Sequence, residues 1–271
     1  MPELPEVETT RRGIAPALVG HRIVKMIVRD RRLRWPIVAN LEAAVRGQLV
    51  LRVERRAKYL IIRLETGSLI VHLGMSGSLR LVSGKTPPKP HEHWDLVLDS
   101  GQVLRFHDPR RFGSLFWTQE DPGDHPLLKK LAPEPLSAAF NGAYLFRVTR
   151  KRAVAIKQLI MNSQLVVGVG NIYASEALFR AGISPRRAAR RLTNAEALKL
   201  AGAIKAVLKA AIKIGGTTLR DYVNADGVPG YFRQKLFVYE RNGEQCRVCN
   251  AIVKQFTQGQ RSTYWCATCQ R

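Results

Sequence analysis

The chain lacks long apolar stretches. No run of 18 apolar residues occurs among its 271 residues, so no membrane-spanning helix is expected. No basic amphipathic helix stands apart from the rest, which argues against a protein that lies on a membrane surface. The first residues, MPELPE, are acidic and interrupted by proline, unlike the basic and then apolar start of a secretory signal peptide. These absences predict a cytoplasmic protein with no membrane partner.

Acidic residues are also scarce. The 21 Asp and Glu residues compare with 44 Lys and Arg residues, which leaves a formal net charge of +23 and a pI near 10.6. A positive field of this strength attracts polyanions. Nucleic acid is the polyanion that remains once a membrane is set aside, so we expect it to be the partner.

Cysteine is scarce too, and its placement is informative. The four cysteines all lie in the last 26 residues, as two Cys-x2-Cys pairs separated by 16 residues. This spacing is typical of a tetrahedral Zn²⁺ site with four thiolate ligands. Disulfides are the alternative, but two intervening residues are too few for an ordinary bridge, and nothing else indicates secretion. The sequence predicts one structural zinc ion bound by Cys246, Cys249, Cys266 and Cys269.

The first half of the chain has a β-rich pattern behind one helix. Pro5 suits a first helical turn, and a helix ended by Gly20 places four apolar residues on one face, namely Leu4, Val7, Ile14 and Leu18. Short β-rich runs follow at 23–28, 59–64, 69–73, 96–98 and 114–117. Because no helix separates these runs, they predict an antiparallel sandwich or barrel.

The second half changes to a helical pattern. A stretch rich in Pro and Gly, 121–135, indicates a domain boundary, and helices are predicted over 154–159, 172–180, 194–214 and 218–222. The clearest is 194–214, which ends before Gly215-Gly216 and has apolar residues at helical intervals, namely Leu198, Ala201, Ile204, Leu208 and Ile212. The zinc module begins near Phe237. The predicted fold class is α+β.

Pro2 has the most unusual chemistry available. Removal of Met1 exposes a secondary amine, which can attack an aldehydic carbon to give an iminium ion, an electron sink that needs no proton. The reference pKa of an α-amine is about 8, well below that of lysine, so more of it is free base at neutral pH. Glu3 and Glu6 are candidate proton shuttles beside it. A purely structural helix start is the alternative, since proline and acidic residues are common there.

Three segments of the β-rich half combine cations or apolar side chains with turns. Lys58 follows two arginines and suits contact with a phosphate or a base, the alternative being a solvated strand edge. Met75 lies on a glycine-flanked turn, HLGMSG, either as core filler or as a wedge for a base stack. Arg110 and Phe112, in DPRRFG, are suited to fill the gap that a displaced base leaves in a base stack, although cation–π packing on the protein surface is the ordinary alternative.

Two segments of the second half suit phosphate binding. In VVGVGNI the glycines allow backbone N–H groups and a helix N-terminus to face a phosphate, and Asn171 can donate its side-chain amide. Arg261 lies inside the zinc module at an expected hairpin tip, where a guanidinium can bind a phosphate through two hydrogen bonds.

Together these segments resemble one family, the bacterial formamidopyrimidine-DNA glycosylases, also called 8-oxoguanine DNA glycosylase/AP lyases. The matches occur in the family's order along nearly the whole chain: PELPEVE at 2–8, RRAKYL at 55–60, HLGMSGSL at 72–79, DPRRFG at 108–113, GVGNIYASEA at 168–177, and the cysteines with Arg261. Each motif alone is modestly specific, whereas six in order are highly specific.

The resemblance implies a fold and a partner. It implies an N-terminal β-sandwich domain over 1–133, a helical domain with a helix-two-turn-helix element over 134–236 and a zinc-finger hairpin over 237–271, with DNA crossing between them. It further implies a monomer, associated with the bacterial nucleoid, that acts on double-stranded DNA containing oxidised bases. Excision of 8-oxoguanine or formamidopyrimidines is followed by β,δ-elimination at the abasic site.

The resemblance also assigns roles to single residues. The implied catalytic set has Pro2 as the Schiff-base nucleophile and Glu3 as the proton donor, joined by Lys58 and Arg261, which contact the lesion and its phosphates. The implied DNA-binding set consists of Met75, His91, Arg110, Arg111, Phe112 and Asn171. Among these, Met75, Arg110 and Phe112 fill the vacated stack, while residues 215–231 resemble a loop over the extruded base.

Two alternatives remain at this point. An endonuclease VIII-like enzyme would act on oxidised pyrimidines, although Leu4 and the set of Met75, Arg110 and Phe112 favour the purine enzyme. A basic zinc protein that only binds DNA or RNA would leave Pro2 inert. With Met1 attached, the Pro2 nitrogen is an amide and cannot act as a nucleophile.

Overall fold

A computed structural model of the protein describes residues 2–215 and 236–271. These residues form two compact units, one of residues 2–129 with 214–215 and one of residues 130–213 with 236–271. Met1 and the predicted helix over 218–222 lie outside the described residues, as does nearly all of the loop expected over 215–231. Among the helices that are described, none is both long and apolar enough to cross a membrane.

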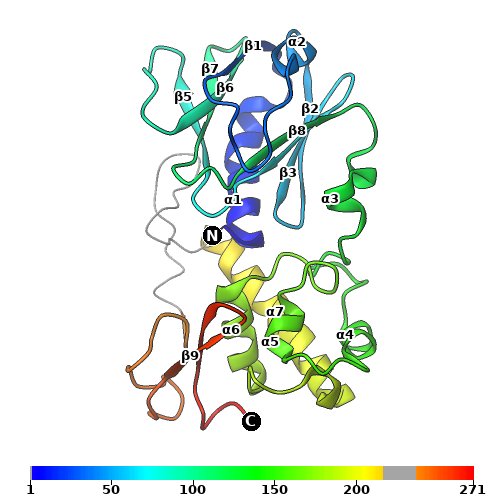
Figure 1. Cartoon of the computed structure of the whole chain (residues 1–271), viewed down its shortest axis with the longest axis vertical. Helices are drawn as coiled ribbons and strands as arrows, with labels where there is room; N and C mark the ends of the chain where they lie inside the picture. Colours follow the sequence, from blue (N-terminus) through cyan, green and yellow to red (C-terminus); the bar gives the residue numbers. More distant parts are fainter. Residues whose placement is uncertain (1, 216–235) are drawn as a thin grey trace. The chain divides into compact units, whose positions relative to one another are not determined.

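The first unit contains two four-stranded antiparallel sheets (Figure 1). One has the order β1 (Ile23–Val28), β6 (Glu92–Leu98), β7 (Gln102–His107) and β5 (Ser78–Ser83). The other has the order β2 (Val50–Arg56), β3 (Tyr59–Leu64), β4 (Ser68–His72) and β8 (Ser114–Thr118). Apolar side chains from both sheets form one core, which includes Leu60, Ile62, Trp94 and Phe106. The predicted antiparallel sandwich is confirmed.

A helix at the N-terminus completes this core. The predicted apolar face of α1 (Leu4–Leu18) is buried, and Pro5 lies in its first turn. The helix packs against β2, β3 and β5. Two short helices, α2 (Leu41–Val45) and α3 (Pro126–Lys129), and the 3-10 turn η1 (Pro122–Asp124) lie in the connections. The strands β2, β5 and β7 were not predicted, since charged or polar residues interrupt each of them.

The second unit is helical. Its elements are α4 (Gly142–Thr149), α5 (Ile156–Ile160), α6 (Asn171–Ala181), η2 (Ala189–Arg191) and α7 (Asn194–Lys213). Turns over 161–170 join α5 to α6, and α4 and α6 both pack on α7. The predicted face of α7 was partly wrong, because Leu198 is 65% exposed and the core side is formed by Ala197, Leu200, Ala201, Ile204, Val207, Leu208 and Ala211.

Helix α5 starts two residues later than predicted. The carbonyl of Val154 accepts from the Ala189 N–H, and Ala155 forms an isolated bridge with Ala188. The backbone before Ile156 is therefore extended and paired with another segment. Long-range pairing of this kind overrides local helical pattern.

The C-terminal module is a β-hairpin docked onto the helices of its own unit. Strands β9 (Lys254–Gln258) and β10 (Arg261–Trp265) are joined by a two-residue turn, Gly259-Gln260, in which both residues have positive φ. The carboxylate of Glu176, on α6, accepts hydrogen bonds from the backbone N–H groups of residues 237, 238 and 239 at 2.9 to 3.1 Å. The backbone of Arg271 bonds to Gly182 and Ser184. Both ends of the module are thus attached to the helical part.

Candidate functional site

The first residues of the chain are fixed by reciprocal hydrogen bonds at the start of α1. The Glu6 carboxylate accepts from the Glu3 backbone N–H at 2.8 Å, and the Glu3 carboxylate accepts from the Glu6 backbone N–H. This capping box satisfies donors that have no partner within the helix. Both carboxylic side chains are about 2% exposed, and Pro2 is buried. The backbone that carries the Pro2 nitrogen is therefore tied to a packed helix.

Glu8 connects this helix to the β2–β3 hairpin, where Lys58 lies. Its carboxylate contacts three guanidinium groups, those of Arg11 at 2.9 Å, Arg12 at 2.8 Å and Arg55 at 3.2 Å. Burial raises the pKa of Glu8, but hydrogen bonds from Arg11 and Arg12 and the charges of Arg11 and Arg55 outweigh it and lower the pKa to about 2. Arg55 also donates to the carbonyl of Ala57, in the turn just before Lys58. An ionised Glu8 thus holds the hairpin turn against the helix that follows Pro2.

Met75 and Phe112 lie on two turns that touch. Gly74 has a φ of 69°, and a Cβ built there would lie 2.4 Å from the Phe112 carbonyl carbon and 2.5 Å from the Gly113 nitrogen. Only glycine fits at such a close approach of two backbones. Met75 is 39% exposed and Phe112 is 47% exposed, and Arg110 is exposed on the same turn as Phe112. The structure thus brings these three predicted residues together.

His72 orders the turn that carries Met75. Its Nδ1 accepts a hydrogen bond from the Gly74 N–H at 3.0 Å, and its ring packs against Tyr59 with centroids 4.8 Å apart. Burial, with the positive charges of Lys58 and Arg34, lowers the pKa of His72 to about 4. The imidazole is therefore neutral at neutral pH, and its Nδ1 can accept this bond.

His91 and Arg111 share a left-handed backbone but differ in their contacts. Their φ angles are 68° and 57°. The Arg111 guanidinium forms an ion pair with Asp30 at 2.9 Å, so this cation is engaged within the protein. The His91 side chain is exposed, and its carbonyl accepts from the Asp108 N–H at 2.9 Å. His91 is thus adjacent to the DPRRFG turn.

In the second unit the structure brings Asn171 and Arg261 together. Asn171 is the first residue of α6, and its amide Nδ2 donates to the carbonyl of Ser262 at 2.9 Å. Arg261 is exposed and immediately follows the hairpin turn. The start of α6 therefore contacts the residue next to Arg261, and a helix N-terminus and a guanidinium are both groups that bind phosphate.

A buried lysine that sequence reasoning missed joins these elements. Lys157, on α5, is 1% exposed, and its ammonium donates to Asn171 Oδ1 at 2.5 Å, Thr263 Oγ1 at 2.7 Å and the Ser262 carbonyl at 3.2 Å. A buried ammonium needs such partners to offset its desolvation. The available signal was a lysine inside the apolar run AIKQLI.

Aromatic contacts also fix the hairpin that carries Arg261. The guanidinium carbon of Arg186 lies 3.9 Å from the Phe256 ring centroid and 5.6 Å from that of Trp265. The Gln258 amide donates to the Pro185 carbonyl at 3.3 Å. Side chains of the segment after α6 therefore hold both strands of the hairpin.

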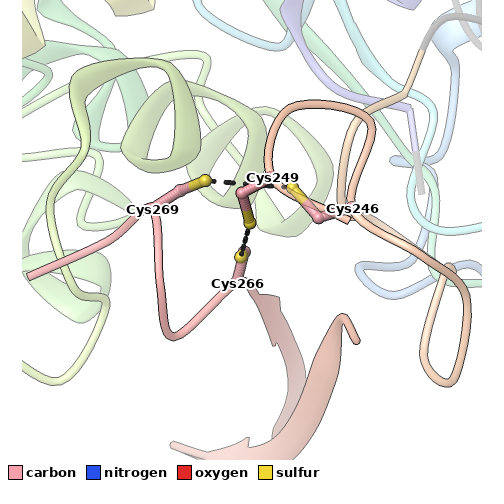
Figure 2. Close-up of side chains that lie close together, drawn as sticks. All are labelled: Cys246, Cys249, Cys266 and Cys269. Carbon is pink, nitrogen blue, oxygen red and sulfur yellow. Dashed lines mark hydrogen bonds between the residues drawn. The ribbon is translucent and has the colours of Figure 1, made fainter. Parts of the chain in front are cut away.

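The four cysteines form a metal centre. Figure 2 shows their sulfur atoms converging from two loops, and all four lie within 4.8 Å of one another. The Sγ atoms of Cys246 and Cys269 are 3.9 Å apart and those of Cys249 and Cys266 are 3.4 Å apart, far beyond a disulfide bond of about 2 Å. Zn–S bonds of about 2.3 Å in a tetrahedron place sulfurs roughly 3.8 Å apart. The residues fit one structural zinc ion, and the disulfide alternative is wrong.

Three family sequence patterns match the chain. The formamidopyrimidine-DNA glycosylase N-terminal domain matches residues 1–115, and the H2TH domain of the same enzymes matches residues 131–223. The zinc finger found in FPG and IleRS matches residues 243–271. The helix-two-turn-helix element and the zinc finger expected from the sequence are thus both present.

Individual relatives match over their full length. A formamidopyrimidine-DNA glycosylase from Stutzerimonas stutzeri is 58% identical over 100% of both chains. The crystal structure of the MutM (Fpg) protein from Thermus thermophilus is similar with a TM-score of 0.89 at 43% identity, covering 99% of this chain and 98% of that one. A Lactococcus lactis Fpg mutant, crystallised with DNA containing Fapy-dG, has a TM-score of 0.92 at 31% identity and covers 100% of both.

Proposed function

This chain belongs to the formamidopyrimidine-DNA glycosylase family, and from that membership we propose that it excises oxidised purines from duplex DNA and then cleaves the strand at the abasic site. The substrates are 8-oxoguanine and formamidopyrimidine lesions. The observation that carries the proposal is the Pro2–Glu3 pair, fixed by the capping box at the start of a buried helix. The match to a Fapy-dG complex supports the same class of lesion.

Pro2 acts as the nucleophile once Met1 is removed. Its secondary amine attacks C1′ of the damaged nucleotide, a C–N bond forms, and the glycosidic bond breaks as the base leaves with the bonding electrons. Glu3 supplies a proton in this step. The C1′–O4′ bond of the sugar then breaks as O4′ takes a proton, which gives the iminium ion. The iminium ion makes the C2′ proton acidic, and successive β- and δ-eliminations release the two flanking phosphates.

Cations on both units bind the DNA backbone. Lys58 contacts the lesion and its phosphate, and it lies beside His72, whose pKa its charge helps to lower. Asn171 and Arg261 bind phosphates from the second unit, where Lys157 fixes the Asn171 amide. Four thiolates leave no open position on zinc, so the ion orders the hairpin that carries Arg261 and takes no part in the bond-breaking steps.

The apolar side chains of Met75 and Phe112 replace the extruded base. Extruding a base costs a few kcal/mol of stacking and pairing, and wedge side chains that fill the gap offset this cost. Arg110, exposed on the Phe112 turn, addresses the opposite base, while His91 and Arg111 contact the DNA nearby. A duplex substrate is therefore required for this part of the process.

Borohydride trapping tests the proposal. A duplex with 8-oxoguanine opposite cytosine is incubated with the full chain and sodium borohydride, and the adduct is digested with trypsin. We expect the DNA to be attached to the peptide that begins at Pro2 and ends at Arg11. Binding without any adduct would contradict the enzymatic function and favour a protein that only binds nucleic acid.

Two controls sharpen this experiment. Pro2→Gln places a large residue after Met1, which blocks removal of Met1 and displaces the secondary amine, so it should bind the duplex and give no adduct. Duplexes with oxidised pyrimidines, trapped in parallel, rank the two lesion classes. Faster trapping on pyrimidine lesions would favour the endonuclease VIII-like alternative.

The enzyme works in the cytoplasm, associated with the bacterial nucleoid. The formal net charge of +23 supports this location because it favours residence on DNA. The domain limits we propose are 1–133, 134–236 and 237–271.

A further inference from the structure

Asp108 lies between the two turns that carry Met75 and Phe112. It directly follows β7, is 0% exposed, and has no role in the chemistry described above. Its Oδ1 accepts a hydrogen bond from Ser76 Oγ at 2.7 Å, and its Oδ2 accepts one from the Gly113 N–H at 2.7 Å. One carboxylate thus binds the residue after Met75 and the residue after Phe112.

The main chain of Asp108 is engaged as well. Its N–H donates to the His91 carbonyl at 2.9 Å. Its own carbonyl accepts from His93 Nε2 at 2.7 Å and from the Arg111 N–H at 3.3 Å. Three segments that are far apart in sequence, 72–77, 91–93 and 109–113, therefore meet at this residue.

The choice of a carboxylate is informative. A buried carboxylate is costly to desolvate, yet the two partners of the Asp108 side chain are a hydroxyl and a backbone N–H. An ionised carboxylate only accepts hydrogen bonds and presents two oxygens, so it suits two donors that approach from different turns. The direct backbone contact at Gly74 leaves little room for the turns to shift.

We propose that Asp108 is a positioning residue for the insertion of Met75, Arg110 and Phe112 into the duplex. This inference rests on the function proposed above. Side chains that are inserted between two base pairs must overcome the stacking energy of those base pairs. Side chains that are already ordered before binding lose less conformational entropy when they enter the duplex. By fixing the two turns relative to each other, Asp108 lets the three side chains enter as one unit.

Asp108→Ala removes both side-chain bonds and tests the inference. On a duplex with 8-oxoguanine opposite cytosine, we expect single-turnover base release to slow about tenfold or more. A 2-aminopurine placed next to the lesion should show weaker unstacking by fluorescence. A single-stranded oligonucleotide with an abasic site has no stack to open, so its borohydride trapping at Pro2 should change less than about twofold.

Three further variants distinguish the loss of a positioning role from a general loss of protein structure. Asp108→Asn should restore most of the duplex activity, since its amide oxygen can accept from the Gly113 N–H and its NH₂ can donate to a rotated Ser76 hydroxyl. Asp121→Ala is the matched control, because Asp121 also accepts from a backbone N–H, that of Gly123 at 2.6 Å, but on an exposed turn. It should leave duplex activity unchanged.

The third variant is Met75→Ala, made in the wild-type and in the Asp108→Ala background. If Asp108 acts through Met75, the double variant should slow base release by less than the product of the fold-reductions caused by the two single substitutions. Fold-reductions that multiply fully, or equal reductions on the duplex and on the single strand, would overturn the inference.

If Asp108→Ala does not fold, Ser76→Ala removes only the bond to the Met75 turn and takes its place in each comparison. A wild-type chain that neither releases the base nor forms an adduct would instead contradict the proposed function.

Discussion

The acidic residues of the first helix differ in what they bind. Glu3 and Glu6 bind backbone N–H groups at the helix start, whereas Glu8, half a turn later, binds three guanidinium groups. The first two fix the backbone beside Pro2, and the third fixes the β2–β3 hairpin beside the helix. Single side chains thus determine how Lys58 and Pro2 are held in the first unit.

Glu8→Gln should therefore lower stability in a pH-dependent way. The folded pKa of about 2 lies below the ordinary value of 4.5, so the stabilisation is fully present above pH 4.5 and is lost as the pH falls toward 2. Glu8 is half-buried, and at pH 7 we expect a loss of roughly 1–3 kcal/mol in the free energy of unfolding, typical of hydrogen bonds to charged groups. Urea unfolding at pH 7 and at pH 3 measures it.

The control for this measurement is Glu42→Gln. Glu42 forms a more exposed ion pair with Arg31, and such pairs contribute at most about 1 kcal/mol. An equal effect of the two variants at pH 7, or an effect of Glu8→Gln that persists undiminished at pH 3, would contradict the role given to Glu8.

Most candidate residues could be named from the sequence because each lies in a short local motif. Pro2, Met75 and Phe112 are examples. Lys157 and Asp108 could not be assigned, since their partners lie up to 106 residues away and a single sequence does not show which distant groups meet. The burial of a charged side chain becomes visible only in the folded chain.

At the scale of elements, strands and helices with strong apolar periodicity were predictable and the others were not. The bounds of β1 and β3 match their predicted ranges. The strand β2 was missed because its sequence, VLRVERR, is mostly charged in its second half, and its pairing with β3 supplies the stability that the pattern does not reveal. The face of α7 was misplaced because small alanines, as well as large residues, contact α4 and α6.

The β9–β10 hairpin should depend on zinc. Four thiolates in a small module supply much of its folding free energy when the metal is bound. We expect about one zinc ion per wild-type chain and almost none in Cys266→Ser, measured by mass spectrometry of the metal. Without zinc, proteases should cut within residues 240–271, and duplex binding should weaken about tenfold or more because Arg261 loses its position.

The first unit provides the internal control for this experiment. Its core includes neither the cysteines nor the hairpin, so its urea transition should be the same with and without zinc. Resistance of residues 240–271 to proteolysis after complete removal of the metal would show that the hairpin folds without it.

At the scale of the whole molecule, the net charge governs association with DNA. A formal charge of +23 gives every duplex, damaged or not, an attraction that falls with salt. Not all of the 44 cations are available to phosphates, however, because several are paired with acids, as Arg105 is with Asp95. The slope of the logarithm of affinity against the logarithm of salt concentration is proportional to the number of phosphates that the protein neutralises, and does not depend on its total charge.

Arg261→Ala should reduce this slope by about 0.9, the value for one phosphate contact on duplex DNA. Lys209→Ala removes the same charge from an exposed position on α7 and should leave the slope unchanged. Fluorescence anisotropy with an undamaged duplex at several salt concentrations gives both values. Identical slopes for the two variants would mean that Arg261 contributes only to the net charge.

The docking of the zinc module has a consequence for synthesis on the ribosome. Glu176 finds its backbone partners about 62 residues later in the chain, and Lys157 finds Thr263 106 residues after itself. While the chain emerges, both charged groups must stay hydrated, so the helical unit cannot bury its core around them until the last segment appears. A nascent chain arrested before residue 236 would therefore remain open and visible to chaperones and proteases, even with α4, α5, α6 and α7 already made.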